Sequence, residues 1–203
     1  MTYKSDIETN NWRVFTISDD YRWVLLVTMF LIVHYFYCVM VAAKPRGTLF
    51  TQEWMEEKFG KEHEQALNGA KIQKGGYPDC GSGRYTMELG YKGWMQFNTA
   101  QRVHLNYLES ISQILTMMLT CGLNYPRTTT VIGGVYLLAR IWFQVGYLLF
   151  GPKGRMKAVP IVMLVQFGFP IFTMVSLAQL ASTGSKLSDV TYVPPVQTAT
   201  PAN

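Results

Sequence analysis

The apolar residues of the chain collect in four blocks, which polar or Gly/Pro-rich segments separate. Each block is close to the length of about 20 residues that an α-helix needs to cross the hydrocarbon core of a bilayer. The blocks cover residues 23–43, 107–125, 131–150 and 158–180, and the first contains no charged residue. The pattern therefore predicts an all-α protein, a four-helix transmembrane bundle whose membrane domain spans residues 23–180.

A cleaved signal peptide is the competing interpretation of the first block, because Val41 and Ala43 stand at acceptable cleavage positions. The apolar core of a signal peptide is only about 7–15 residues long, and this block is longer. We therefore expect it to be a membrane-spanning helix.

Between the first two blocks lies a long segment, residues 44–95, which we expect to be an extramembrane loop. Apolar residues among Glu and Lys predict a short amphipathic helix within it that lies in the membrane interface. The stretch Gly81-Ser82-Gly83-Arg84 is either an anion-binding nest or an ordinary loop, and the lack of a preceding strand favours the loop. An N-terminal segment, 1–22, and a Thr/Pro-rich tail, 181–203, flank the membrane domain. The apolar residues of the predicted interfacial helix are Phe50, Trp54, Phe59 and Leu67.

Composition excludes several other classes of protein. With 49% apolar and 15% charged residues, the 203-residue chain is too apolar to be disordered. Its net charge of +5 comes from scattered residues without a basic run, so nucleic acid is not an expected partner. The three cysteines, at 38, 80 and 121, form no CxxC pair and no metal-ligand spacing, so we expect neither a disulfide scaffold nor a metal site.

Basic residues are distributed unevenly between the two sides of the predicted bundle. Eleven follow the first and third helices, whereas five lie in the N-terminus, the connection between the second and third helices, and the tail. The positive-inside rule places both loops of the richer side in the cytoplasm or matrix, with both termini opposite. The eleven are Lys44, Arg46, Lys58, Lys61, Lys71, Lys74, Arg84, Lys92, Lys153, Arg155 and Lys157, and the five are Lys4, Arg13, Arg22, Arg127 and Lys186.

Charged residues near the membrane are few and follow the helical period. A charge at the centre of a spanning helix costs about 2.5–3.5 kcal/mol on insertion scales, so each one needs a partner or water. Two interpretations are open: a cationic pocket at the basic rim with Glu109 deeper, or a structural ion-pair network of Arg102, Glu109 and Arg140. The residues concerned are Arg102, Asn106, Glu109 and Gln113 on one face of the second helix, and Arg140 and Tyr147, seven apart, on the third.

At these residues the sequence resembles the family of membrane-associated proteins in eicosanoid and glutathione metabolism, and within it the type 3 microsomal glutathione S-transferases. The first matching segment is FNTAQRVHLNYLE, residues 97–109, in which Arg, Asn and Glu recur at the family's spacing. The second is residues 134–147, which end in ARIWFQVGY and are followed by Gly151-Pro152 and Arg155. The resemblance covers about residues 97–180 and includes four helices in the same order.

The resemblance implies an integral membrane homotrimer that binds glutathione between neighbouring subunits, with Arg155 as the catalytic group beside the sulfur. The implied activity is that of a glutathione S-transferase or peroxidase acting on lipophilic electrophiles or lipid hydroperoxides that arrive from the lipid bilayer. The implied location is the endoplasmic reticulum or the outer mitochondrial membrane. The implied glutathione-binding residues are Arg102, Asn106, Glu109, Arg140 and Tyr147.

Two departures from the family pattern bear on this activity. Where the family commonly has Tyr and then Pro after the Glu of the second helix, this chain continues with Ser110, Ile111 and Ser112. Phe143 stands where the family has a second Tyr. Both changes remove a hydroxyl, and a lost hydrogen bond to a charged group costs about 1.5–3 kcal/mol.

These departures, together with the long first loop, support an alternative. The chain would then be a non-catalytic family member, a structural subunit of a larger membrane complex in the mitochondrial inner membrane. A third candidate is a lipid-binding scaffold without transferase chemistry.

Overall fold

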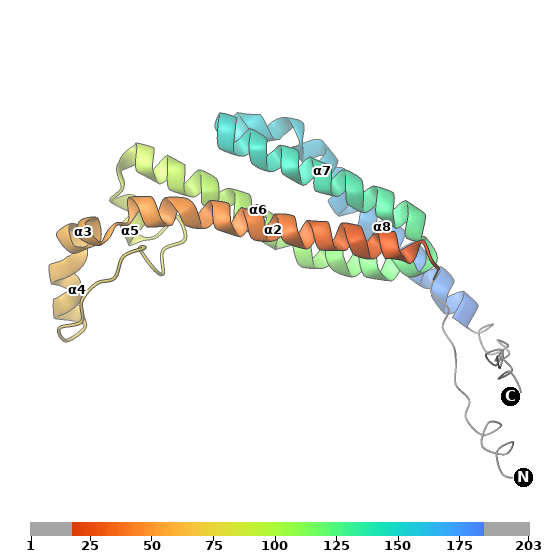
Figure 1. The fold of residues 1–203 in the computed structure, drawn as a ribbon, viewed down its shortest axis with the longest axis horizontal. Helices are drawn as coiled ribbons and strands as arrows, with labels where there is room; N and C mark the ends of the chain where they lie inside the picture. The colour runs from red at the N-terminus through yellow and green to blue at the C-terminus, as the bar shows by residue number, and fades with distance from the viewer. Residues whose placement is uncertain (1–17, 185–203) are drawn as a thin grey trace, which may run out of the picture.

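The computed structural model of the chain describes residues 18–184, and every regular element in this range is helical, which confirms the all-α class. Its framework is four long helices that run alternately in opposite directions (Figure 1), with α2 and α6 side by side and α7 and α8 packed on them. The helices are α2 (Tyr21–Leu49), α6 (Gly90–Asn124), α7 (Pro126–Phe150) and α8 (Val159–Gly184).

Three helical runs of the described residues are long and apolar enough to cross a membrane: α2, Pro126–Lys157 and Val159–Ser182. The helix α6 is not among them, although it is 35 residues long. Glu109, Gln113 and several Ser and Thr residues interrupt its apolar half. The predicted crossing over residues 107–125 therefore remains a prediction.

The helices extend well beyond the apolar blocks that predicted them. The helix α2 continues past Ala43 to Leu49, and α6 begins at Gly90 rather than near Tyr107. Apolar composition marks bilayer depth, whereas backbone hydrogen bonding continues wherever the next turn has packing partners. The connection between the first two long helices is consequently shorter than the predicted loop, 44–95.

This connection is folded. It contains α3 (Gln52–Met55), a π-helical turn η1 (Glu56–Gly60), α4 (Lys61–Ala66) and α5 (Arg84–Met87). The predicted interfacial helix thus exists as the continuous helical stretch 52–66, but its apolar side packs within the protein, while Leu67 is exposed. A second hydrophobic core, which we call the loop core, forms from Phe50, Met55, Phe59, Ile72 and Phe97.

Arg46 holds the connection against the end of α2. Its guanidinium is buried and donates hydrogen bonds to the carbonyl oxygens of Gly75 (2.9 Å), Gly76 (3.3 Å) and Asp79. The same group lies 4.3 Å from the ring centre of Tyr77. From the sequence, Arg46 is expected only to add to the charge of the basic side, whereas in the structure it is the central hydrogen-bond donor of this segment.

The main core lies where α2, α6, α7 and α8 meet, around Tyr107 and Tyr136, which have at most 1% of their surface exposed. The Tyr107 hydroxyl donates to the Leu31 carbonyl oxygen at 3.2 Å, and His34 Nε2 lies 2.8 Å from Gln144 Oε1. Many large apolar side chains of α2, α7 and α8 instead point outward, as expected for helices that face lipid.

The predicted terminal segments fall largely outside the described residues. Only residues 18–22 of the segment 1–22 are described, and of the tail 181–203 only 181–184, which continue α8.

Candidate functional site

Arg140 lies in the middle of α7 with 2% of its surface exposed, and all its partners are neutral. Its Nε donates to the Tyr136 hydroxyl at 2.8 Å, and one terminal nitrogen donates to Asn106 Oδ1, also at 2.8 Å. The other terminal nitrogen donates to the Asn106 carbonyl oxygen at 3.2 Å and to the Ser110 hydroxyl. The guanidinium also lies 4.7 Å from the ring centre of Tyr107. Arg140 therefore joins α7 to α6 through hydrogen bonds and ring contacts.

The ion-pair network of Arg102, Glu109 and Arg140 does not form within residues 18–184. The salt bridges in this range are Arg84–Glu62 and Arg127–Asp20, each at 2.6 Å. Arg140 has no carboxylate partner because the polar face of α6 is divided between the two sides of the helix. Ser110 and Asn106 turn toward α7, while Glu109 turns outward.

Arg102, Glu109 and Gln113 are exposed on the outer side of α6. The structure brings Asn106 and Arg140 together, but it leaves Arg102 and Glu109 away from that pair. As the chain stands, these two charged groups are open to a ligand or to a second subunit.

Arg155 and Tyr147 form a second part of the predicted site. The 3-10 helical segment η2 (Gly151–Lys157) folds back along the end of α7 and places the Arg155 guanidinium 5.1 Å from the ring centre of Tyr147. The rings of Phe143 and Tyr147 are stacked, with centres 5.9 Å apart. Arg155 Nε is buried and has no hydrogen-bond partner in the described chain. An unpaired buried N–H of this kind is available to an anionic ligand.

The ring of Phe143 lies near both the Arg140 and the Arg155 guanidinium groups. The Arg140 guanidinium lies 5.7 Å from the centre of its ring, and that of Arg155 lies 5.8 Å from it. An aromatic face attracts a guanidinium without an oxygen atom, so the replacement of the family's Tyr by Phe still leaves both cations a partner.

Two glycines allow η2 to fold this closely onto α7. A Cβ atom at Gly146 would lie 2.5 Å from the Gly154 carbonyl oxygen, and one at Gly154 would lie 2.0 Å from the Gly146 carbonyl oxygen. The turn between them uses Gly151 at a φ of +64°, in the left-handed region that favours glycine. The contact fixes the position of Arg155 relative to Tyr147, because Arg155 directly follows Gly154.

A groove with a volume of about 1150 Å³ lies between the end of α2, the start of α6 and the end of α7. Tyr147 contributes to its wall, so the groove borders the Arg155 site. The groove does not follow from the sequence pattern, because it depends on how three helices pack at one end of the bundle.

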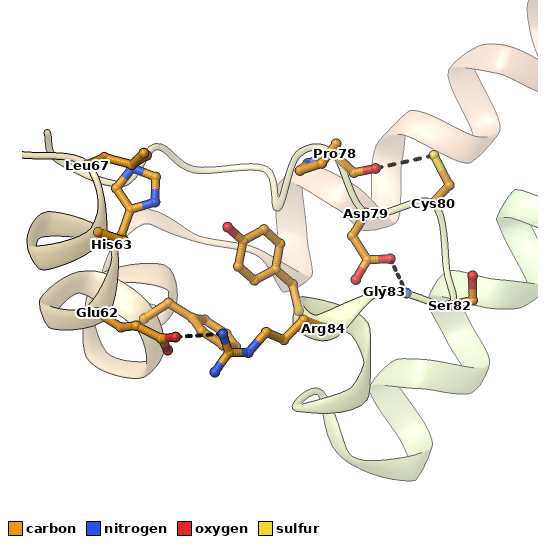
Figure 2. A pocket seen from close by; sticks show the side chains of 12 residues that line it. Glu62, His63, Leu67, Pro78, Asp79, Cys80, Ser82, Gly83 and Arg84 are labelled. Carbon is orange, nitrogen blue, oxygen red and sulfur yellow. Dashed lines mark hydrogen bonds and ion pairs between the residues drawn. The ribbon is translucent and has the colours of Figure 1, made fainter.

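A second hollow, with a volume of about 610 Å³, lies on the folded connection (Figure 2) between α4 and the residues around Cys80. Its charged groups are already engaged, since Arg84 pairs with Glu62 and the Asp79 carboxylate turns into the backbone. The residues 18–184 contain no cluster of three or more His, Cys, Asp or Glu that would hold a metal ion.

The stretch 81–84, for which the sequence favours an ordinary loop over an anion-binding nest, has backbone amides that bind a carboxylate of the chain itself. Asp79 Oδ1 accepts hydrogen bonds from the backbone amides of Gly81 (2.8 Å) and Gly83 (3.0 Å), and Oδ2 accepts one from Thr86 (2.7 Å). Burial alone would raise the pKa of Asp79, but the hydrogen bonds from Thr86, Gly81 and Gly83 outweigh it and hold the pKa below its ordinary value. The nest thus binds an internal carboxylate.

Sequence reasoning missed Tyr136 and Ser110, the two hydroxyl groups on Arg140. Tyr136 precedes Arg140 by four residues, and Ser110 follows Asn106 by four, so each pair shares a helix face. This spacing of four residues is the sequence feature from which both hydroxyl groups could have been predicted to lie near Arg140.

Comparison with known protein families gives a match to one of them: the model described as the MAPEG family covers residues 22–175. No curated protein and no solved structure matches the chain.

Proposed function

This chain belongs to the MAPEG family, and on that premise we propose that it is a membrane glutathione S-transferase or peroxidase that acts on lipophilic electrophiles or lipid hydroperoxides. Family membership and three long apolar helices make it an integral membrane protein with a role of the glutathione and eicosanoid type. The proposal also has three finer parts. The chain is related to the type 3 microsomal glutathione S-transferases, α6 is a fourth membrane-spanning helix, and glutathione is the co-substrate.

The observation that carries the proposal is the unpaired buried Nε of Arg155 beside Tyr147. A free thiol with a pKa of about 8.5 is mostly protonated at neutral pH, and only the thiolate attacks an electrophile. A guanidinium stays charged at every relevant pH, so one held close to the sulfur favours the thiolate. Arg155 is the catalytic residue of this proposal, and Tyr147 orients it.

The remaining binding residues divide into two groups under the same proposal. Arg102 and Glu109, which lie exposed on α6, would hold the charged ends of glutathione across a homotrimer interface. Asn106 contributes through its amide, whose oxygen accepts from Arg140. Arg140 acts as a positioning residue, because its hydrogen bonds already end on its own chain.

The test compares Arg155→Gln with Lys157→Gln, which removes an exposed charge from the same η2 segment. Purified protein is assayed with glutathione and either a hydroperoxide or a chlorinated aromatic acceptor, and thiolate formation is followed by ultraviolet absorbance. We expect Arg155→Gln to lose at least about tenfold in rate at neutral pH, since a nearby opposite charge shifts a pKa by about 1–3 units. The Lys157→Gln variant should keep the wild-type rate. Absence of turnover and of a thiolate signal in folded wild-type protein would reject the enzyme.

One observation favours a second function, that of a structural subunit in a larger membrane complex. Arg140, which the family resemblance assigns to glutathione, is saturated by Asn106, Ser110 and Tyr136. Affinity purification of the tagged full chain from gently solubilised membranes separates the two functions. Recovery of a homotrimer alone supports the enzyme in the endoplasmic reticulum or outer mitochondrial membrane, whereas stoichiometric companion subunits from the inner membrane support the structural role.

A further inference from the structure

The groove between α2, α6 and α7 combines an apolar wall with two cationic groups. Its apolar lining includes Met40, Met95 and Leu148, one from each helix, and its only charged lining residues are Lys44 and Lys92. Both lysines are exposed, and neither forms a salt bridge within the part of the chain that the structure describes. A groove of this composition suits a molecule with an apolar body and an anionic end.

Residues near both lysines are of the kind found where the bilayer meets water. Lys44 is the first charged residue after the uncharged run 23–43 of α2. Lys92, on the opposite wall, lies in the sequence between Tyr91 and Trp94. The ring centres of these two aromatic residues are 5.7 Å apart. Tyr and Trp concentrate at the membrane interface, so this end of the groove corresponds to the headgroup layer. The apolar part of the groove then continues toward the hydrocarbon.

From this arrangement we propose that the groove binds an anionic phospholipid. The phosphate lies between Lys44 and Lys92, and an acyl chain follows the apolar wall past Met40 and Leu148. The groove is lined by the ends of α2 and α7, and the loops that follow these two helices carry most of the basic residues. Anionic lipids are abundant in the cytoplasmic leaflet, and basic residues at that surface attract them.

The groove shares Tyr147 with the thiol site proposed above, but its two lysines do not belong to that site. Lys44 and Lys92 take no part in the contacts of Arg155, and Arg155 is not among the residues that line the groove. The variants at Lys44 and Lys92 leave Tyr147 and Arg155 unchanged, so lipid retention and glutathione turnover are tested by different substitutions.

The experiment is native mass spectrometry of the full chain in a neutral detergent. Phosphatidylglycerol and phosphatidylcholine with identical acyl chains are added as an equal mixture, and the ratio of retained lipids is measured. We expect preferential retention of phosphatidylglycerol. In the double variant Lys44→Gln/Lys92→Gln the preference should fall by about tenfold or more, since each basic residue near an anionic surface contributes roughly a fivefold factor.

Two control variants keep the result interpretable. Lys58→Gln/Lys61→Gln removes two exposed lysines from η1 and α4, outside the groove, and should retain the wild-type preference. Lys44→Arg/Lys92→Arg keeps both charges and should retain it as well. Equal retention of the two lipids by wild type would overturn the proposal, as would an equal loss in the Lys58/Lys61 variant. Complete displacement of the lipid by excess glycerol phosphate would also overturn it, because the apolar wall would then contribute nothing.

Discussion

At the scale of single residues, the role of a charged residue depends on whether its side of the helix faces a neighbouring helix or the outside of the bundle. Arg102 and Arg140 are both arginines within helices of a membrane protein, yet Arg102 is exposed and Arg140 has 2% of its surface exposed. A buried guanidinium without a carboxylate needs many hydrogen bonds to offset the loss of water. Asn106, Ser110 and Tyr136 supply them.

This contrast makes a prediction about stability. The variant Arg140→Lys keeps the charge, but a single ammonium cannot replace the planar set of donors that reaches three side chains. We expect it to lower the free energy of unfolding by about 1.5–3 kcal/mol, the cost of losing a hydrogen bond to a charged group. The matched variant Arg102→Lys should stay within about 0.5 kcal/mol of wild type. Thermal unfolding in detergent checks both, and equal stability of the two variants would show that the Arg140 hydrogen bonds contribute little.

At the scale of elements, the chain depends on segments that fold back onto the long helices. The segment η2 packs onto α7 through Gly146 and Gly154, and the connection 50–89 packs onto α2 and α6 through Arg46 and the loop core. Neither contact follows from helical periodicity. In each case the end of a predicted helix packs against a segment that the hydrophobic pattern leaves as a loop.

The glycine contact predicts opposite effects for two identical substitutions on α7. Gly146→Ala places a methyl group against the Gly154 backbone, and overpacking of this kind costs about 1–3 kcal/mol. At Gly134, by contrast, a Cβ atom would meet nothing within 4 Å. Gly134→Ala should raise stability by about 0.5–1 kcal/mol, because alanine favours the helix. Unfolding midpoints of the two purified variants provide the measurement. If both substitutions stabilised the protein, the close approach of η2 would not be needed.

At the scale of the whole molecule, the two loops of the basic side lie at one end of the bundle. The helices α2 and α7 run toward that end, while α6 and α8 run away from it (Figure 1). The positive-inside prediction needs this arrangement, since it assigns the connection 50–89 and η2 to the same compartment.

Cysteine labelling tests this orientation with the chain's own residues. Cys80 is exposed in the connection, whereas Cys38 and Cys121 are buried. In vesicles whose cytoplasmic or matrix face points outward, a membrane-impermeant maleimide should label wild-type Cys80. In a Cys80→Ser background it should also label Lys157→Cys, but Thr128→Cys, an exposed position in the first turn of α7, should react only after the membrane is permeabilised. Labelling of the 157 and 128 positions from the same side would contradict the proposed topology.

The sequence by itself determined where the long helices carry their apolar stretches, because hydrophobic runs and helical periods are local properties of the chain, but it did not determine where those helices begin and end. It also supplied the family segments at 97–109 and 134–147 and the excess of basic residues on one side. Residue spacing along one helix was enough to group Arg102, Asn106 and Glu109, but not to say which neighbour each would face.

Only the tertiary structure decided how those residues divide. The packing of α7 on α6 buries Arg140 with Asn106 and leaves Arg102 and Glu109 outside. The folding of η2 onto α7 brings Arg155 to Tyr147, and the spread of three helix ends opens the groove at Lys44 and Lys92. These features depend on contacts between residues distant along the chain, and the free energy of such contacts is set by shape and burial that no local pattern encodes.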